Sequence, residues 1–375
     1  MEYFLGLILA LLPTYLIRFR IGIPTTLLEI LIVVFLFTTL LKLIAKPSDL
    51  SKIKQLGKIN YVIAGFALAA IISTLISPDK RVALGQLKAF IIEPVLLFYA
   101  ILLTIKADEL KTSLKWLLLS ASVISLFGIL QYFTFILLPL RFWGTGAEVE
   151  RITSFFDYPN ALALYLAPLI GFYFTLWLKK YSLGIKNYTL ATALAIMSIA
   201  LILTFSRGGL VASVVVCALL LVQHYGCKKT LPSMVICALI LFLISPIRQR
   251  LLLGLTDPSS NAHFGLWQIA FEKITQNPIF GNGLAGFATL NLSVNYPHNL
   301  FLNFWLELGL LGLVSFCAIV ILAWQTIKKN QPLSLAAGVF LLILVLHGFV
   351  DVPYFKNDLS VMFWFTISIF YLNKF

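Results

Sequence analysis

His298 and Asn299 stand side by side at the start of a long apolar segment, in the stretch YPHNLFLNFWLELGLLG. An imidazole is the side chain best suited to accept a proton near neutral pH. The first turn of a helix carries the positive end of the helix dipole, which disfavours the charged imidazolium form. The pair is therefore predicted to supply a neutral general base, His298. Asn299 is predicted either to cap the helix or to hold a sugar hydroxyl.

A second candidate for chemistry is the tetrapeptide Ser206-Arg207-Gly208-Gly209, which joins two apolar segments. The two glycines are predicted to end one helix and to reverse the chain sharply. A guanidinium group offers two parallel N–H donors, which match the oxygens of a phosphate better than a lysine ammonium does. Arg207 is therefore a candidate ligand for an anionic substrate.

The elements that position these residues are predicted to be membrane helices. The chain has 375 residues, of which 60% are hydrophobic and 11% are charged, and its mean hydropathy is +0.97. A helix needs about 20 mostly apolar residues to cross a bilayer, and such windows recur along the whole chain. We predict an all-α polytopic membrane protein, a single transmembrane domain over residues 1–375, with about twelve spans. The predicted spans are 3–17, 25–45, 59–77, 83–105, 116–138, 161–178, 188–205, 208–225, 231–246, 299–325, 333–350 and 359–373.

Lysine and arginine separate along the chain once its N-terminus is placed in the cytoplasm. The N-terminal segment MEYFLGLILALLP lacks the basic region of a cleaved signal and is predicted to be an uncleaved first span. The inner loops then carry lysine alone, as the positive-inside rule requires, and both termini are cytoplasmic. Every arginine falls on the outer side: Arg18, Arg20, Arg81, Arg141, Arg151, Arg207, Arg248 and Arg250.

This distribution bears on the kind of partner. Arginine that runs against the positive-inside bias indicates an anionic ligand at the outer face, although headgroup anchoring would explain any single arginine. Membrane topology also explains the net charge of +13, so nucleic-acid binding is not predicted. The cysteines and histidines lack the spacing of a metal site, and no metal or other cofactor is predicted.

The longest predicted outer loop, residues 247–298, lies between the ninth and tenth spans and is predicted to be structured. In its segment HFGLWQIAFEKI, Phe264, Trp267, Phe271 and Ile274 recur at helical spacing. The spacing predicts an amphipathic helix that lies on the bilayer or caps a cavity. The following GNGLAG, residues 281–286, matches a dinucleotide-binding pattern but lacks the preceding strand, so it is predicted to form a tight turn.

Other ionisable residues fall inside predicted spans. Lys88 and Glu93 are five residues apart, a spacing that suits mutual pairing poorly. Glu307 follows Asn299 and Asn303 at steps of four, which predicts one polar stripe facing the bundle interior. His347 and Asp351 are also four apart and are predicted to pair with each other at the outer end of a span.

Several of these segments together resemble the O-antigen ligase and polymerase superfamily. The most specific is His298-Asn299, followed after nine residues by Gly309-Leu310-Leu311-Gly312. Ser-Arg-Gly-Gly before a span, RITSFFDYPNALALYL with its Pro-Asn at Asn160, and the outer-loop helix followed by Pro-Ile-Phe-Gly-Asn-Gly are similar to further family segments. The resemblance runs over roughly residues 80–351.

The resemblance implies a metal-independent glycosyltransferase in the cytoplasmic (inner) membrane, with its long loop in the periplasm. Members take a glycan from an undecaprenyl-pyrophosphate carrier and transfer it to a glycan, lipid or protein acceptor. His298 would then activate the acceptor hydroxyl, and Arg207 would bind the pyrophosphate. Arg151 and Lys88 match further basic positions. His263 stands where the family usually has an arginine, so either His263 binds the pyrophosphate in partly protonated form or Arg248 or Arg250 takes that place.

Two other functions remain open at this point. A glycan polymerase of the same superfamily uses the same donor and similar motifs, so the sequence does not separate it from a ligase. A lipid or polysaccharide transporter would have broken helices, internal repeats and a charged site at the membrane midplane. The polar features of this sequence instead gather at one predicted face.

Overall fold

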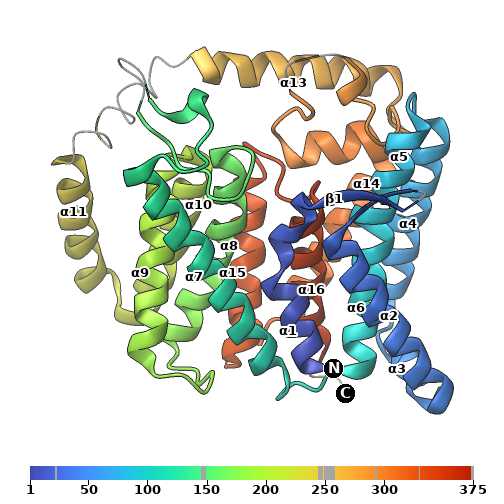
Figure 1. Cartoon of the computed structure of the whole chain (residues 1–375), viewed down its shortest axis with the longest axis horizontal. Coiled ribbons are helices and arrows are strands. Elements are labelled where there is room, and N and C mark those ends of the chain that lie inside the picture. The colour runs from blue at the N-terminus through green and yellow to red at the C-terminus, as the bar shows by residue number, and fades with distance from the viewer. Residues whose placement is uncertain are drawn as a thin grey trace.

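The chain folds into a bundle of helices with one short β-hairpin in the computed structural model (Figure 1). The structure describes residues 1–21, 23–144, 149–243, 248, 258–290, 292, 294–328 and 330–372. The hairpin pairs β1 (Arg18–Ile21) with β2 (Ile23–Thr26) in antiparallel register. The helices are α1 (Glu2–Ala10), η1 (Leu12–Leu16), α2 (Leu27–Ala45), η2 (Pro47–Leu50), α3 (Ser51–Gln55), α4 (Lys58–Ile76), α5 (Lys80–Gln86), η3 (Leu87–Ile92), α6 (Glu93–Thr104), α7 (Leu110–Thr134), η4 (Leu140–Phe142), α8 (Pro159–Leu178), α9 (Asn187–Leu203), α10 (Arg207–Tyr225), α11 (Cys227–Leu243), α13 (Pro258–Gln276), η5 (Ala288–Leu290), α14 (Leu300–Gln325), α15 (Pro332–His347) and α16 (Asn357–Leu372).

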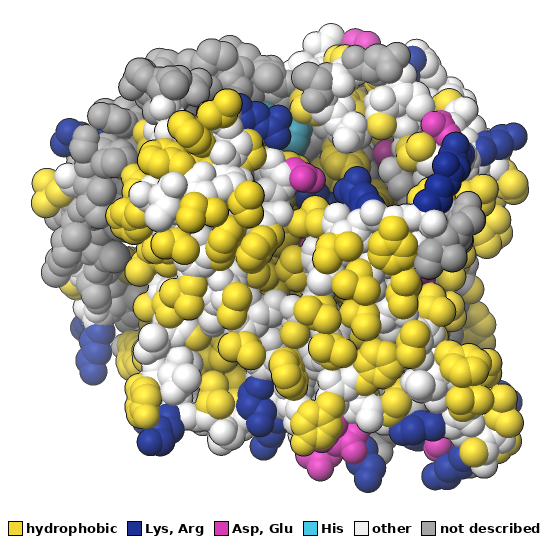
Figure 2. All heavy atoms as spheres, in the orientation of Figure 1, with side chains coloured by type: hydrophobic (Ala, Val, Ile, Leu, Met, Phe, Trp, Pro, Cys, Tyr) yellow, Lys and Arg dark blue, Asp and Glu magenta, His cyan; other side chains and the backbone are white. Residues whose placement is uncertain are grey.

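Seven helical segments of the described chain are long and apolar enough to cross a bilayer. They are α2, α4, the continuous α5–η3–α6 segment, α7, α8, α10 and α14. Shorter apolar helices, α9, α15 and α16, pack among them, and Figure 2 shows a belt of apolar side chains between two charged ends. Each predicted span overlaps a helix, so the predicted helical membrane architecture is confirmed, while the count of about twelve spans stays a prediction.

The two ends of the bundle differ in the basic residues they carry. At the end covered by α13, hereafter the α13 face, lie the hairpin with Arg18 and Arg20 and the beginnings of α5, α8, α10, α14 and α16 (Figure 1). Arg81 and Arg207 occupy the first turns of α5 and α10. The start of α1 and the end of α16 lie at the opposite end (Figure 1). Of the predicted outer arginines, Arg250 lies outside the described residues.

The segment α5–η3–α6 contains a π-helical turn because of a proline. Pro94 has no N–H to donate to the carbonyl of Phe90, and its ring would collide with that carbonyl in a regular α-helix. The chain widens into the π-helix Leu87–Ile92 ahead of it. The hydroxyl of Tyr354 then donates to the Phe90 carbonyl at 2.8 Å. This bond fixes the connection between α15 and α16, which carries Asp351, to the body of the bundle.

Helix α14 is interrupted at Gly309, whose φ of 69° and ψ of −174° are not helical. The interruption frees backbone groups, and neighbours from two other segments bind them. The Leu306 carbonyl accepts from the Asn282 N–H, and the Leu310 N–H donates to the Ile279 carbonyl at 3.0 Å. The Ser73 hydroxyl of α4 donates to the Glu307 carbonyl at 2.6 Å. The loop after α13 is thereby bound to α14, which α4 contacts at the same interruption.

Glycines make this insertion possible. A Cβ on Gly281 would lie 2.6 Å from the Gly309 nitrogen, and a Cβ on Gly309 would collide with the backbone of Ile279. Gly281 and Gly283 have φ of 74° and 86°, so the predicted tight turn at GNGLAG is confirmed. Asn303 and Glu307 are fully buried, which confirms that the predicted polar stripe of α14 faces the interior.

The predicted helix in HFGLWQIAFEKI is confirmed as α13, and its apolar stripe lies in more than one environment. Ile274 is buried, whereas Phe264 and Phe271 are 64% and 54% exposed. The helix buries Ala270 and Ile274 against Phe287 and Leu306. The small side chain of Ala270 lets α13 approach α14 closely, so the larger phenylalanines turn away from that contact.

Replacing Gly309 with alanine should lower the thermal unfolding midpoint of the detergent-solubilised protein. A residue with a Cβ held at this φ costs roughly 1–3 kcal/mol, and the collision with Ile279 adds to that cost. Gly85→Ala is the matched control, because Gly85 lies in α5 with no atom within 4 Å of its Cβ position. The control should keep or raise the midpoint. An unchanged midpoint for Gly309→Ala would contradict the role given to the interruption.

Candidate functional site

A cavity of about 560 Å³ opens at the α13 face between α8, α10, α13 and α15. Its polar lining is Arg151, Asn160, Ser206, Arg207, His263, His347 and Asp351. Its apolar lining includes Phe205, Val211, Val215, Phe264, Trp267, Leu346 and Val350. Figure 2 shows this end of the molecule hollowed, with basic, acidic and histidine side chains gathered around the hollow. The cavity is therefore polar near the surface and apolar along α10.

Arg151 is held in a fixed orientation at this cavity. Its Nε donates to the Thr204 carbonyl at 2.8 Å, and its guanidinium also donates to Oδ1 of Asn160 at 2.8 Å. Asn160 lies in the first turn of α8, and Thr204 ends α9. The Pro-Asn segment thus positions an arginine, a role that the sequence alone did not reveal.

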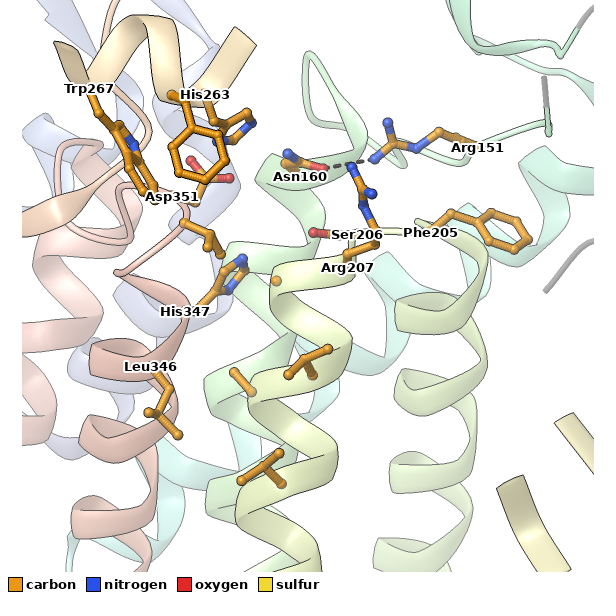
Figure 3. A pocket seen from close by; sticks show the side chains of 16 residues that line it. Arg151, Asn160, Phe205, Ser206, Arg207, His263, Trp267, Leu346, His347 and Asp351 are labelled. Carbon is orange, nitrogen blue, oxygen red and sulfur yellow. Dashed lines mark hydrogen bonds between the residues drawn. The ribbon is translucent and has the colours of Figure 1, made fainter. Parts of the chain in front are cut away.

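Arg207 is the first residue of α10, and its guanidinium points to the same space beside Asn160 as that of Arg151 (Figure 3). Two guanidinium groups repel each other unless an anion lies between them. The N-terminus of α10 adds N–H groups and the positive end of a helix dipole. The arrangement is suited to bind a phosphate or pyrophosphate.

The glycines after Arg207 have a different role from the one predicted. The chain reverses at Phe205, whose φ is 49°, whereas Gly208 and Gly209 lie inside the first turn of α10. A Cβ on Gly208 would lie 2.9 Å from Cδ2 of His347, and one on Gly209 would lie 3.2 Å from Cε1 of the same ring. The glycines therefore let α15 approach α10, which brings His347 to the cavity.

The side chain of Asp351 pairs with His298 and not with His347, its predicted partner. Nδ1 of His298 lies 3.1 Å from Oδ1 of Asp351, which also accepts from the Val352 N–H at 2.9 Å. The Asp351 N–H donates to the His347 carbonyl, so the four-residue spacing corresponds to a backbone hydrogen bond and not to a contact between the two side chains. The carboxylate points instead across to the start of α14. Because an ionised carboxylate only accepts hydrogen bonds, Nδ1 carries the proton and Nε2 is the basic nitrogen.

The pair changes the proton affinity of both members. Burial lowers the pKa of His298, but the hydrogen bond and the charge of Asp351 together raise it above its ordinary value. Burial raises the pKa of Asp351, yet the contact with His298 lowers it to about 2. The prediction that the helix dipole leaves His298 with a reduced affinity for protons is therefore wrong, since a buried carboxylate in contact outweighs it.

The backbone of His298 is held in an unusual conformation by the same neighbours. Its φ is 50°, in the left-handed region that non-glycine residues rarely adopt. The Leu300 N–H donates to the Gly348 carbonyl at 2.7 Å, and Nδ2 of Asn299 donates to the Phe349 carbonyl at 3.0 Å. Three contacts in succession thus fasten residues 298–300 to residues 348–351. Strain of this kind is typical of functional sites.

Asn299 is a helix cap, which decides between the two predicted roles. Its Oδ1 accepts from the N–H groups of Phe301 and Leu302 at 3.0 Å each. With Nδ2 bound to the Phe349 carbonyl, both ends of the amide are occupied by backbone. The two residues of the His-Asn pair therefore have different roles. Asn299 fixes the start of α14, and the ring of His298 is bound through Nδ1 to Asp351.

His263 lies on α13 directly beside this pair. It lines the cavity, and its ring centroid is 5.0 Å from that of His298. Two imidazoles therefore stand together, one of them at the position where the resemblance implies an arginine. Arg248, the other described candidate for that role, is exposed and does not line the cavity.

Lys88 is not brought into the cavity. Its ammonium group lies 3.3 Å from Oε1 of Glu29 and donates to the Pro24 carbonyl at 3.0 Å. The partner is thus Glu29 of α2 rather than Glu93, because the π-helical turn directs Lys88 toward α2 and the hairpin. This contact joins α2 to α5–η3–α6 and gives Lys88 a structural role.

Asn299→Ala should lower the thermal unfolding midpoint, because α14 loses a cap worth about 1 kcal/mol and a bond to α15. Asn299→Asp is the matched control, since its carboxylate keeps the two accepted hydrogen bonds and loses only the donation to Phe349. Thermal denaturation of the two purified variants should rank wild type above Asp and Asp above Ala. A midpoint for the alanine variant equal to that of wild type would exclude a capping role.

Comparison with known proteins agrees with the motifs at this cavity. A search among curated proteins finds no match to the chain. A family model described as O-antigen ligase matches residues 192–317. The matched segment is about a third of the chain and includes Arg207, His263, His298 and the Gly309–Gly312 motif. The resemblance to the O-antigen ligase superfamily is thereby confirmed over residues 192–317, in a chain whose described part has several helices long and apolar enough to cross a membrane.

Proposed function

We propose that the protein transfers a glycan from an undecaprenyl-pyrophosphate carrier to an acceptor hydroxyl, with His298 as the general base. One observation carries the proposal. A histidine oriented by a buried carboxylate adjoins a cavity that also holds two arginines. Glycosyl transfer from a lipid pyrophosphate requires a base for the acceptor hydroxyl and a site for the anionic leaving group.

The shape and lining of the cavity favour a lipid-linked donor. Arg151, Arg207 and Asn160 form its polar part, and Val211, Val215 and Leu346 continue it along α10 and α15. Val211 and Val215 are 63% and 45% exposed, so this side of the cavity opens toward the apolar surface of the bundle. A prenyl pyrophosphate has the same two-part character, a charged head and a hydrocarbon chain.

The transfer step follows from these positions. Nε2 of His298 accepts the proton of the acceptor hydroxyl, and the hydroxyl oxygen attacks the anomeric carbon of the glycan. The bond from that carbon to the pyrophosphate oxygen breaks, and its electron pair leaves with the lipid pyrophosphate. Arg207 and Arg151 stabilise the negative charge that develops on this leaving group.

Asp351 assists the base in two ways. By accepting a hydrogen bond from Nδ1, it fixes the tautomer that leaves Nε2 free. Its charge also stabilises the imidazolium that forms when the proton is taken. Asp351 touches neither reactant in this scheme and acts through His298.

The face of the membrane is part of the proposal. The end of the bundle opposite the α13 face would lie in the cytoplasm together with both termini, and the α13 face would lie in the periplasm. The glycan would then be transferred at the outer surface of the cytoplasmic membrane. Acceptors of the classes that the family implies, a glycan, a lipid or a protein, reach the site from that side.

A transporter is a weaker alternative because of what fills the interruption in α14. In transporters, the groups freed by a broken helix bind the substrate or the coupling ion. Here the loop after α13 and Ser73 of α4 occupy the freed groups of Leu306, Glu307 and Leu310. The cavity itself lies at one face of the bundle rather than at its midplane.

His298→Ala should reduce transfer from purified lipid-linked donor by roughly 10²–10⁴-fold, the usual contribution of a general base. His224→Ala is the matched control, since His224 lies exposed near the end of α10 away from the cavity. Product formation by the His298 variant at the wild-type rate would exclude the catalytic assignment.

In the same assay, lipid-linked repeats supplied without a second acceptor are lengthened only by a polymerase.

Asp351→Asn should lower the rate and move the acidic limb of the pH–rate profile to lower pH. The carboxylate raises the pKa of His298, so wild-type activity is lost as pH falls through that raised value. Without the charge, His298 stays unprotonated to lower pH but is a weaker and less well oriented base. The profile of transfer rate against pH checks this, and an acidic limb that stays in place would contradict the role given to Asp351.

A further inference from the structure

His347 is a buried residue of the cavity to which the proposed reaction gives no role. It ends α15, is 1% exposed and lines the cavity. Among the described residues, none forms a hydrogen bond with its Nδ1. A buried ring nitrogen without a partner is unfavourable, and such groups in native proteins call for an explanation. Packing against Gly208 and Gly209 explains why one edge of the ring is buried, but it does not explain the buried Nδ1 without a partner.

The position of His347 along the cavity indicates what it could bind. On one side, toward the α13 face, lies Asp351, one helical turn beyond His347, and Arg207 lies on the neighbouring helix α10 (Figure 3). On the other side lie Leu346 and the α10 residues Val211 and Val215. The imidazole thus stands at the border between the charged and the apolar parts of the cavity.

A prenyl pyrophosphate placed in the cavity would have its lipid-side phosphate at this border. Its outer phosphate, which carries the glycan, would lie toward Arg151 and Arg207, and its hydrocarbon chain would run past Val211 and Val215. A neutral imidazole suits the border because its N–H binds a phosphate oxygen without placing a second full charge beside hydrocarbon. The Asp351 carboxylate does not compete for this N–H, since it is bound to His298 and to the Val352 N–H.

We propose that His347 donates a hydrogen bond to the lipid-side phosphate of the carrier and so sets how deep the carrier lies beside His298. The proposal rests on the proposed function and extends it to a residue that the motifs do not include. It makes His347 a binding residue for any prenyl phosphate, because monophosphates and diphosphates both have a phosphate at that position.

The test is binding of undecaprenyl monophosphate and undecaprenyl diphosphate to the purified full-length protein in detergent. His347→Leu should weaken the binding of both lipids by about tenfold or more, the effect of losing a hydrogen bond to a charged group. His347→Gln, which keeps an N–H donor, should bind both lipids within about threefold of wild type. His224→Leu removes an exposed histidine at the far end of α10 and should leave both affinities unchanged.

The outcomes separate this inference from the proposed function. Equal binding of both lipids by wild type and His347→Leu would overturn the inference alone. A loss confined to the diphosphate would place His347 at the outer phosphate and would overturn it as well. Failure of the wild type to bind undecaprenyl diphosphate would overturn the proposed function and the inference with it. Thermal denaturation checks folding, and His347→Met replaces the leucine variant if that variant unfolds.

Discussion

The interruption of α14 at Gly309 is the constraint on which the arrangement of the site depends. Inside a membrane, backbone groups that leave a helix must find partners within the protein. The loop after α13 provides them through Ile279 and Asn282, and α4 provides another through Ser73. Without the loop, the Leu306 carbonyl and the Leu310 N–H would lose these partners. Helix α13, with His263 and Trp267, is thereby held over the cavity.

The site is assembled from segments that are far apart in the sequence, each fixed by a short-range device. Asn160 and the Thr204 carbonyl orient Arg151, and the cap at Asn299 fixes the start of α14. Tyr354 anchors the segment that carries Asp351 by binding the carbonyl that Pro94 leaves free. Arg151, Arg207 and Asp351, with His298 bound to that carboxylate, are thus brought together without a shared helix.

Much of this was accessible from the sequence, because the relevant signals are local. The apolar windows predicted the helices, and the His-Asn spacing and the arginine pattern predicted His298 and Arg207. The pairing of Asp351 was not accessible, since the four-residue spacing favours His347 and only the packing of α15 against α14 directs the carboxylate to His298. The pairing of Lys88 with Glu29 was likewise not accessible, because it joins two helices that are far apart in the sequence. Local spacing predicts which faces residues occupy, whereas partners across helices depend on tertiary contacts.

The left-handed backbone of His298 restricts which residue suits this position. At a φ of 50° a glycine would suit the fold better than any residue with a Cβ. The chain instead holds a histidine there and fastens it with three contacts to the end of α15. Backbone conformation alone would therefore favour glycine over the residue that occupies this site. Under the proposed function, reactivity sets the identity of residue 298, and the surrounding hydrogen bonds make that choice compatible with a stable bundle.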